Sequence, residues 1–199
     1  MRVVRALSLG LVFAAVLSLM PGVASAAEEW IIKQGGQSHS EQTVDVVGLL
    51  DVFGTMRIGV GGWYGMSLVP EGFIKPINDA FFLEVGAYLE HDRYSWGYAG
   101  YDCTVSWNRL SPLGGVRWNF YLTPEWTVFA TSKLGYAIGF GDSESCSGPT
   151  GTYNASSGVN YSAFQFDGAA GAYWKMSDAW SLRLELSYIG PVVGASMKL

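Results

Sequence analysis

The residues of this chain that could do chemistry are two histidines, two cysteines and a scatter of carboxylates and amines. His91 is followed by Asp92 and then by Ser95, and a histidine with an acid and a serine is a combination used in nucleophilic catalysis. No serine motif accompanies this histidine, so a solvated His91 is the simpler interpretation. Glu84 and Glu90 could share acid–base work, but six residues of strand would place them about 20 Å apart. That distance is too long for cooperation, and we expect no enzyme activity.

The two cysteines favour a bridge over a metal site. His39, His91, Cys103 and Cys146 are too few and too dispersed to supply the ligands of a zinc site, so we expect no metal and no cofactor. Both cysteines lie in stretches that we expect to be long loops on one face. In an exported protein with only two cysteines, this favours a disulfide between them. Two free thiols, or a link between two chains, are the alternatives.

Twelve charged side chains recur at alternate positions of extended, largely apolar stretches. They are six acids and six bases: Asp45, Asp51, Arg57, Glu84, Glu90, Arg117, Lys133, Asp167, Lys175, Arg183, Glu185 and Lys198. The opposite parity of the same stretches holds no charge. Successive side chains of a strand point to opposite faces, so all twelve would share one face. We expect them to form a paired charge network inside a barrel.

The stretch Leu110–Gly141 shows most clearly which elements would position these charges. On both sides of Thr123–Glu125, apolar and aromatic residues alternate with glycines, polar residues and the isolated charges of Arg117 and Lys133. A period of two predicts an antiparallel hairpin of unusually long, two-faced strands. Tryptophan and tyrosine lie near the ends of the apolar face. This arrangement is typical of a barrel with lipid outside and polar groups in the lumen.

Seven such strands begin at or after Arg57, and an eighth is available in Thr43–Phe53. That segment is compatible with a strand or a short helix, because short apolar runs do not discriminate between them. Single-chain bacterial barrels normally have an even number of strands, and this parity favours the strand. The predicted fold is therefore an all-β, eight-stranded antiparallel transmembrane up-and-down β-barrel.

The connections between the strands predict the orientation of this barrel. Asp92–Arg109 and Asp142–Tyr161 are expected to be long, irregular extracellular loops, and Thr123–Glu125 and Ser177–Ala179 tight periplasmic turns. Four tryptophans lie beside the two tight turns and predict an interfacial aromatic girdle. They are Trp118, Trp126, Trp174 and Trp180.

The N-terminus predicts export. Two arginines, an apolar stretch and the small residues before position 27 indicate a signal peptide, residues 1–26, cleaved near Ala26; an uncleaved membrane anchor is the alternative. Residues 27–42 would then be an N-terminal periplasmic tail, and residues 43–199 the barrel. Only 15% of the chain is charged and the formal net charge is −5, against about 25% charged in a typical soluble domain. Nothing in this composition favours nucleic-acid binding.

With these strands in view, Thr43–Leu199 resembles the small outer-membrane barrels of the OmpA/OmpX and opacity-protein type. The resemblance is carried by the central hairpin GGVRWNFYLTPEWTVFATSKLGYAIGFG and by the closing strand VVGASMKL. It implies an integral protein of the cell outer membrane in a Gram-negative envelope, surrounded by outer-membrane lipid and lipopolysaccharide. It also implies that the barrel-assembly machinery reads the C-terminal strand. Members of this group are often structural or adhesive, without a fixed enzymatic role.

The sequence accordingly favours an outer-membrane barrel with a side-chain-plugged lumen and a structural or surface-interaction role, with an extracellular ligand left open. A lipid A-modifying outer-membrane enzyme using His91 is the first alternative, and a narrow, porin-like channel the second. A soluble lipocalin-like carrier, with the apolar face turned inward, is the third. The aromatic residues between Asp92 and Arg109 fit either a contact surface or interfacial anchoring.

Overall fold

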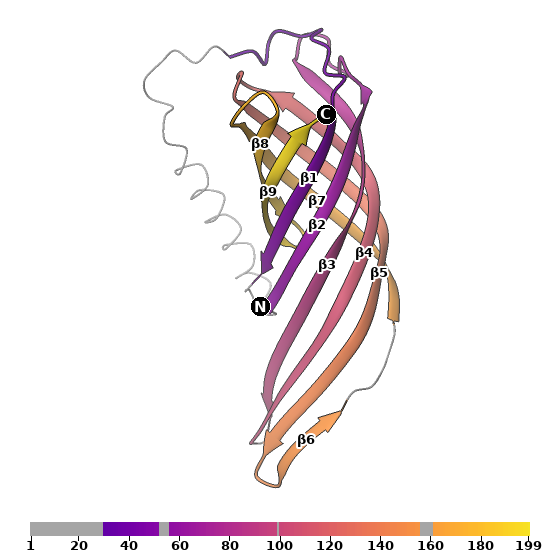
Figure 1. Ribbon diagram of the computed structural model, residues 1–199, viewed down its shortest axis with the longest axis vertical. Helices are drawn as coiled ribbons and strands as arrows, with labels where there is room; N and C mark the ends of the chain where they lie inside the picture. Colours follow the sequence, from indigo (N-terminus) through magenta and orange to yellow (C-terminus); the bar gives the residue numbers. More distant parts are fainter. Residues whose placement is uncertain (1–29, 52–55, 99, 156–160) are drawn as a thin grey trace, which may run out of the picture.

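The computed structural model describes residues 30–51, 56–98, 100–155 and 161–199, which fold into antiparallel strands (Figure 1). The strands are β1 (Gln42–Asp51), β2 (Met56–Val69), β3 (Asp79–Tyr98), β4 (Tyr101–Tyr121), β5 (Trp126–Gly148), β6 (Gly151–Ala155), β7 (Tyr161–Lys175), β8 (Trp180–Ser187) and β9 (Gly190–Lys198). The predicted signal peptide lies outside the described residues, as do Val52 and Phe53. The remainder of the ambiguous segment Thr43–Phe53 is a strand, within β1.

Eight of the nine strands close into a ring. The order in the sheet is β4-β3-β2-β1-β9-β8-β7-β5-β6, and an additional pairing between β4 and β5 completes the barrel. Every pairing between neighbours is antiparallel. Among the described strands, β6 pairs only with β5, beside the far end of that strand. The predicted eight-stranded antiparallel up-and-down barrel is confirmed, and β6 is an addition to it.

Both predicted extracellular loops are wrong, because they are largely strand. In place of a loop from Asp92 to Arg109, β3 continues to Tyr98 and β4 starts at Tyr101. In place of a loop from Asp142 to Tyr161, β5 continues to Gly148 and then turns into β6. Polar strands of this kind are stabilised by pairs across the ladder, which a scan along the chain does not reveal. The hydroxyls of Ser95 and Thr104 and those of Ser106 and Ser143 form such pairs, at 2.9 and 2.8 Å.

These additional strand segments form a four-stranded sheet that projects beyond the barrel, and we call it the extension. It comprises residues 93–98, 101–106, 143–148 and 151–155 of β3, β4, β5 and β6. Figure 1 shows β3, β4 and β5 continuing well past the ends of β1, β2, β8 and β9. Since β2 pairs with β3 only as far as Arg93, the extension is supported by the barrel only at its base.

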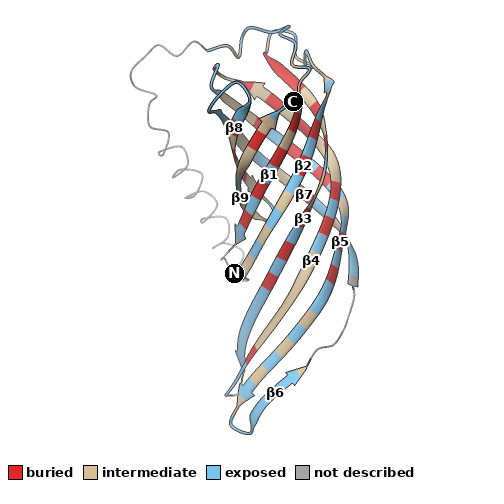
Figure 2. Ribbon diagram, in the orientation of Figure 1, coloured by how far each residue is buried: buried red, intermediate tan, exposed pale blue. Residues whose placement is uncertain are grey.

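Burial in the barrel is inverted relative to a soluble protein. Along the barrel strands, exposed residues tend to alternate with more buried ones (Figure 2), and many of the buried positions hold charged groups. Arg183, Lys133 and Glu84 are fully buried, whereas Val46 and Phe164 are each 65% exposed. A folded chain in water would turn these apolar groups inward, so the outer surface is suited to an apolar solvent.

The two ends of the barrel differ. At one end, which we call the turn end, lie Thr123–Glu125, Ser177–Ala179 and the longer connection 70–78; the extension leaves from the other. Residues 31–41 cross the turn end as a strap: Ile31 N–H donates to Leu122 O at 2.9 Å, and His39 N–H donates to Pro70 O at 2.9 Å. None of the described residues belongs to a helix long and apolar enough to cross a membrane.

Candidate functional site: the lumen and the extension

The lumen contains a fully buried ionic cluster near its middle. Arg117 on β4 and Arg183 on β8 both contact Asp45 on β1 and Glu84 on β3; the distances to Glu84 Oε1 are 2.7 and 3.1 Å. The Tyr173 hydroxyl lies among the same groups, accepting from Arg117 and donating to Asp45. Arg117 and Glu84 lie on the neighbouring strands β4 and β3, whereas the other three arginine–carboxylate contacts link strands that are not paired with each other.

The cluster continues along β5, β7 and β8. Arg183 also pairs with Glu185, whose other oxygen lies 3.3 Å from Lys133 Nζ. Lys133 in turn lies 3.7 Å from Asp167 Oδ2 and 4.3 Å from the centre of the Trp63 ring. Each buried cation thus faces at least one carboxylate, as the cost of burying a charge requires.

A second ionic cluster lies at the end of the lumen next to the extension. Arg57 Nε contacts Asp92 Oδ1 at 2.6 Å, and Arg109 holds Glu90 with two nitrogens, at 2.8 and 2.9 Å. Ser111 donates a further hydrogen bond to Glu90. Asp92 and Arg109 are not among the predicted lumen charges, because both lie in a stretch that the sequence predicts to be a loop. The alternation that continues past Glu90 could have found them.

An apolar layer separates the two clusters. Val47, Leu49, Trp63, Tyr88, Leu113, Ile189 and Val192 are all buried and in mutual contact. A smaller apolar group lies towards the turn end, where Ala80, Phe82 and Tyr121 pack with Ile31 of the strap. Eight strands leave an interior that side chains can just fill. The described part of the lumen is filled in this way, in alternating ionic and apolar layers, except for a cavity between the central cluster and the turn end, whose lining includes Arg117 and Tyr173.

Three of the twelve predicted lumen charges lie at the two ends of the barrel. Lys175 and Lys198 are half-exposed at the turn end, where they pair with Asp178 at 2.8 Å and Glu41 at 3.2 Å. Both line a cavity of about 160 Å³ beneath the strap. Asp51 is half-buried at the opposite end of β1, where it directly opposes Arg57 of the second cluster. The remaining nine, together with Asp92 and Arg109, form the two clusters.

The residues considered for catalysis are not brought together. His91 is exposed on the outer surface, where its Nδ1 lies 3.0 Å from Asn108 Oδ1. Asp92 points the other way, into the lumen, and is paired with Arg57 and Arg109. Ser95 is hydrogen-bonded to Thr104 in the extension. Alternation along β3 therefore separates the histidine from the acid.

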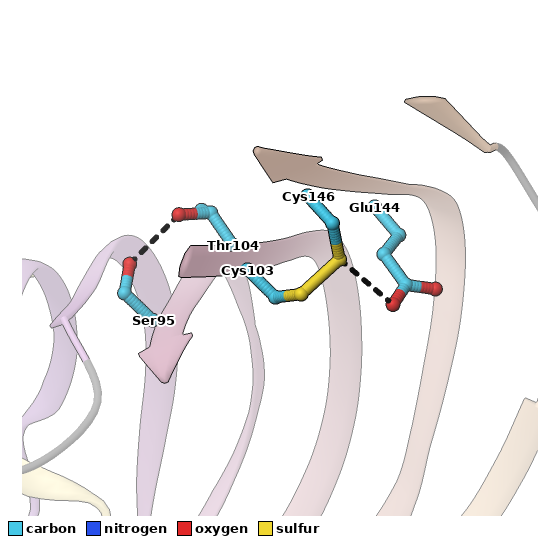
Figure 3. Close-up of a disulfide and its surroundings, with 5 residues drawn as sticks. All are labelled: Ser95, Cys103, Thr104, Glu144 and Cys146. Carbon is cyan, nitrogen blue, oxygen red and sulfur yellow. Dashed lines mark hydrogen bonds between the residues drawn. A yellow bond between two sulfur atoms is a disulfide. The ribbon is translucent and has the colours of Figure 1, made fainter. Parts of the chain in front are cut away.

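Cys103 and Cys146 form a disulfide in the extension, between directly opposed residues of β4 and β5 (Figure 3). This register depends on Gly141, which has a φ of 64°. Arg109 of β4 faces Gly139 of β5, whereas three residues earlier on β4 Ser106 faces Ser143, four residues later on β5. The ladder is therefore irregular between these two pairs, and β5 contains one extra residue there. A left-handed glycine at a bulge is a known way to insert it. Without the insertion, Cys103 would face Ser145 rather than Cys146.

The same geometry gives the extension two unlike faces. Residues that face each other across strands share a face, and the face continuous with the lumen, which we call the inner face, carries Tyr94, Trp96, the disulfide and Tyr153. The outer face, continuous with the exposed apolar surface of the barrel, carries polar residues: Arg93, Ser95, Asp102, Thr104, Ser145 and Asn154. The rings of Tyr94 and Trp96 therefore lie on the side away from any lipid around the barrel.

The four girdle tryptophans all lie near the turn end, on the outer surface. Trp126 and Trp174 face each other across β5 and β7, with ring centres 6.1 Å apart. Trp118 is held by a hydrogen bond from Nε1 to Asp79 Oδ2, at 2.7 Å, and it contacts Phe73 and Phe120. Trp180 is exposed and faces Met197. The predicted girdle of tryptophans therefore also includes phenylalanine side chains.

Comparison with known proteins identifies no family. No protein-family model matches the chain, and no curated protein matches it. Among solved structures, the chain is similar to a designed transmembrane β-barrel, with 17% identity and a TM-score of 0.44 over 82% of this chain and 98% of that one. It is also similar to Ail, the attachment invasion locus protein of Yersinia pestis, with 10% identity and a TM-score of 0.38 over 82% and 99% of the two chains. Ail in complex with the heparin analogue sucrose octasulfate gives 13% identity and a TM-score of 0.38, with the same coverage. Likeness at this level does not assign a function to this chain.

Proposed function

We propose that this chain is an integral outer-membrane barrel of the small OmpA/OmpX and opacity-protein type, with a closed lumen and a role in surface contact. The observation that carries this proposal is the inverted burial of the barrel. Ionic clusters fill the inside, and the outward positions of the described barrel strands carry mainly apolar, aromatic and small residues. The one carboxylate at these positions, Asp79, lies at the turn end, where it is buried and accepts a hydrogen bond from Trp118. A charge on a lipid face near the midplane costs about 2–4 kcal/mol for Arg or Lys, which accounts for their absence there.

The spacing of the outer aromatic residues matches a membrane. Trp126 and Trp174 form one level, and Tyr136 and Phe164, with ring centres 6.1 Å apart, form another. Ten residues separate the two levels on both β5 and β7. Ten residues of strand rise about 33 Å, and a tilt of about 40° reduces this to about 25 Å, the height of the apolar band of such barrels.

The ends of the barrel support an orientation. Short turns face the periplasm and longer connections the outside in barrels of this type, so the turn end would be periplasmic and the extension extracellular. In this setting the outer surface would contact lipid and lipopolysaccharide, and β9 would be read by the barrel-assembly machinery. The extension would be the part of the chain that meets the surroundings of the cell.

The layered lumen favours a closed barrel over a channel. A narrow path would have to pass the apolar layer around Trp63 and Tyr88 as well as both ionic clusters. A soluble carrier would need an apolar interior, which the buried charges oppose. The separation of His91 from Asp92 gives a lipid A-modifying enzyme no assembled site among the described residues.

Membrane fractionation with heat-modifiable gel migration tests the location. We expect the protein in the outer-membrane fraction, with a faster-migrating band before boiling than after it. Planar-bilayer recording of the purified protein tests the lumen, where we expect no steady conductance. A soluble protein without a heat shift would contradict the membrane assignment, and a large steady conductance would contradict the closed lumen alone.

A further inference from the structure

The inner face of the extension exposes three aromatic side chains. Tyr94, Trp96 and Tyr153 are 45%, 40% and 63% exposed, although each belongs to a paired strand. The Cys103–Cys146 bridge lies between Trp96 and Tyr153 in the same cross-strand row. Tyrosine and tryptophan are enriched at protein–protein interfaces, so rings grouped on one face of one sheet form a candidate contact surface.

The rings of this face are not membrane anchors. Interfacial aromatic residues lie on the lipid side of a barrel, but alternation places Tyr94 and Trp96 on the lumen side of β3. The lipid side of the same segment carries His91, Arg93 and Ser95. The rings are therefore directed at the space outside the lumen rather than at the bilayer.

The rings are also presented on a rigid support. The disulfide joins β4 to β5 in the middle of the sheet, and β6 continues the pairing on one side. Tyr101 lies against the backbone of Gly148, where a side chain would collide with its ring. Tyrosine and tryptophan offer a large contact area with few rotatable bonds, so binding to such a surface orders little.

Among the described residues, the inner face of the extension carries one charged side chain, which is negative. Glu144 is the one charged residue at the inner-face positions of the extension that the structure describes. Its Oε1 lies 3.7 Å from Cys146 Sγ (Figure 3). Because a disulfide sulfur carries no proton, it donates no hydrogen bond to Glu144. The carboxylate therefore remains able to accept hydrogen bonds from a ligand. A carboxylate beside electron-rich rings attracts lysine and arginine, by ion pairing and by the ring quadrupole.

The size of the face limits what it can hold. Four strands span three spacings of about 4.8 Å, or about 14 Å, and the described rows cover a similar length along the strands. A patch of roughly 200 Å² by these spacings is far below the roughly 800 Å² that each partner buries in a stable globular complex. It is wide enough for one helix of about 10–12 Å diameter or one extended segment.

We propose that the inner face of the extension, around Trp96, Tyr153 and Glu144, is a docking surface for a cationic polypeptide segment with apolar side chains. The apolar side chains of that segment pack on the rings, and a lysine or arginine pairs with Glu144. This inference rests on the proposed function, because it requires the extension to lie outside the membrane.

The test uses the full chain in nanodiscs of phosphatidylcholine, with a fluorescent 14-residue lysine/leucine peptide as probe and a glutamate/leucine peptide of the same length for comparison. Anisotropy is measured against empty nanodiscs. We expect saturable binding of the lysine peptide only. Trp96→Ala combined with Tyr153→Ala should weaken it about ten-fold or more, and Glu144→Gln about three-fold.

Asp102→Asn is the matched control, because it removes one negative charge from the opposite face of the same sheet. It should leave the affinity unchanged. Equal losses in Asp102→Asn and Glu144→Gln, or equal binding of the two peptides, would overturn the proposal. So would self-association of the protein that disappears in Trp96→Ala, since the face would then belong to a second copy. The heat shift of the same samples reports the barrel separately, so a folded, inserted barrel that fails to bind refutes only the docking surface.

Discussion

At the scale of single residues, the lumen depends on groups that satisfy one another across the barrel. Arg117 and Arg183 come from β4 and β8, yet both reach Asp45 on β1 and Glu84 on β3. A buried ion pair adds little net stability compared with a well-packed apolar core, but removal of one partner leaves a buried charge without compensation. The lumen should therefore tolerate the loss of single charges poorly.

Asp45→Asn is the sharpest test of this dependence, because it removes a charge while nearly preserving shape. Arg117 would then keep only Glu84, which it shares with Arg183, and we expect a loss of about 3 kcal/mol in the free energy of unfolding. Urea titration of the protein folded into vesicles measures it. Lys175→Gln, at the half-exposed turn-end pair with Asp178, should change little. Similar losses in both variants would show that burial of the central cluster is not what matters.

The strap should respond to pH through Glu41. Burial opposes ionisation of this carboxyl, but Lys198 and hydrogen bonding hold its pKa below the usual 4.5. Because the pKa of Glu41 is lower in the folded state, its ionised form stabilises the strap at pH values above the pKa of the unfolded chain. This contribution is lost as the pH falls through the pKa of the folded state. Lys198 is half-exposed, so the effect should stay below about 1 kcal/mol.

Hydrogen exchange at the His39 amide, which donates to Pro70 O, reports this change. In the native chain we expect the protection of this amide against exchange to decrease as the pH falls below 4.5. In Glu41→Gln we expect no such decrease. An unaltered decrease in the variant would assign it to another group.

At the scale of elements, the bulge at Gly141 decides whether the extension can be cross-linked. Residues 127–139 of β5 point inward at odd positions, whereas Cys146 points to the same face from an even one. The inserted residue changes the parity. A side chain at Gly141 would have to adopt a φ of 64° and would also approach Asn108 at 3.1 Å.

Gly141→Val should therefore reduce formation of the Cys103–Cys146 bridge. A β-branched residue in the left-handed region costs on the order of 1–3 kcal/mol, and a strand without the bulge presents Ser145 to Cys103. Gel mobility with and without reductant measures the fraction of bridged monomer. Ser143→Val, in extended backbone on the same strand, should keep the bridge. If Gly141→Val is fully bridged as well, another residue sets the register.

At the scale of the whole molecule, the outer surface is a band with aromatic edges and a small-residue centre. Ala130 and Ala170 face each other midway between the two aromatic levels, and both are exposed. In water an exposed alanine pair would tolerate almost any polar replacement. In a bilayer the same pair lies at the midplane, where a charge is least tolerated.

Ala130→Lys distinguishes the two environments. We expect a loss of about 2–4 kcal/mol in the free energy of unfolding from vesicles, measured by urea titration. Asn154→Lys, on the outer face of the extension, should have little effect, because that residue is in water. Equal tolerance of both lysines would mean that the barrel surface is not embedded in lipid.

Much of this architecture was determined by the sequence alone, because alternation is a local property. Glu84, Arg117 and Arg183 could be assigned to the inside, and Val46 and Phe164 to the outside, from parity and the cost of a charge on a lipid face. The expectation of an even number of strands likewise favoured a strand over a helix for Thr43–Phe53 and predicted eight barrel strands.

Only the tertiary structure decided where the strands end and which groups meet. Residues 93–106 and 143–155 are too polar to be identified as strands from their own composition; their stability comes from partners such as Ser106 and Ser143, far apart in the chain. The Gly141 bulge, the faces of the extension and the meeting of Arg183 with Asp45 follow from register and closure of the sheet. These are relations between strands, and a pattern read along one strand does not contain them.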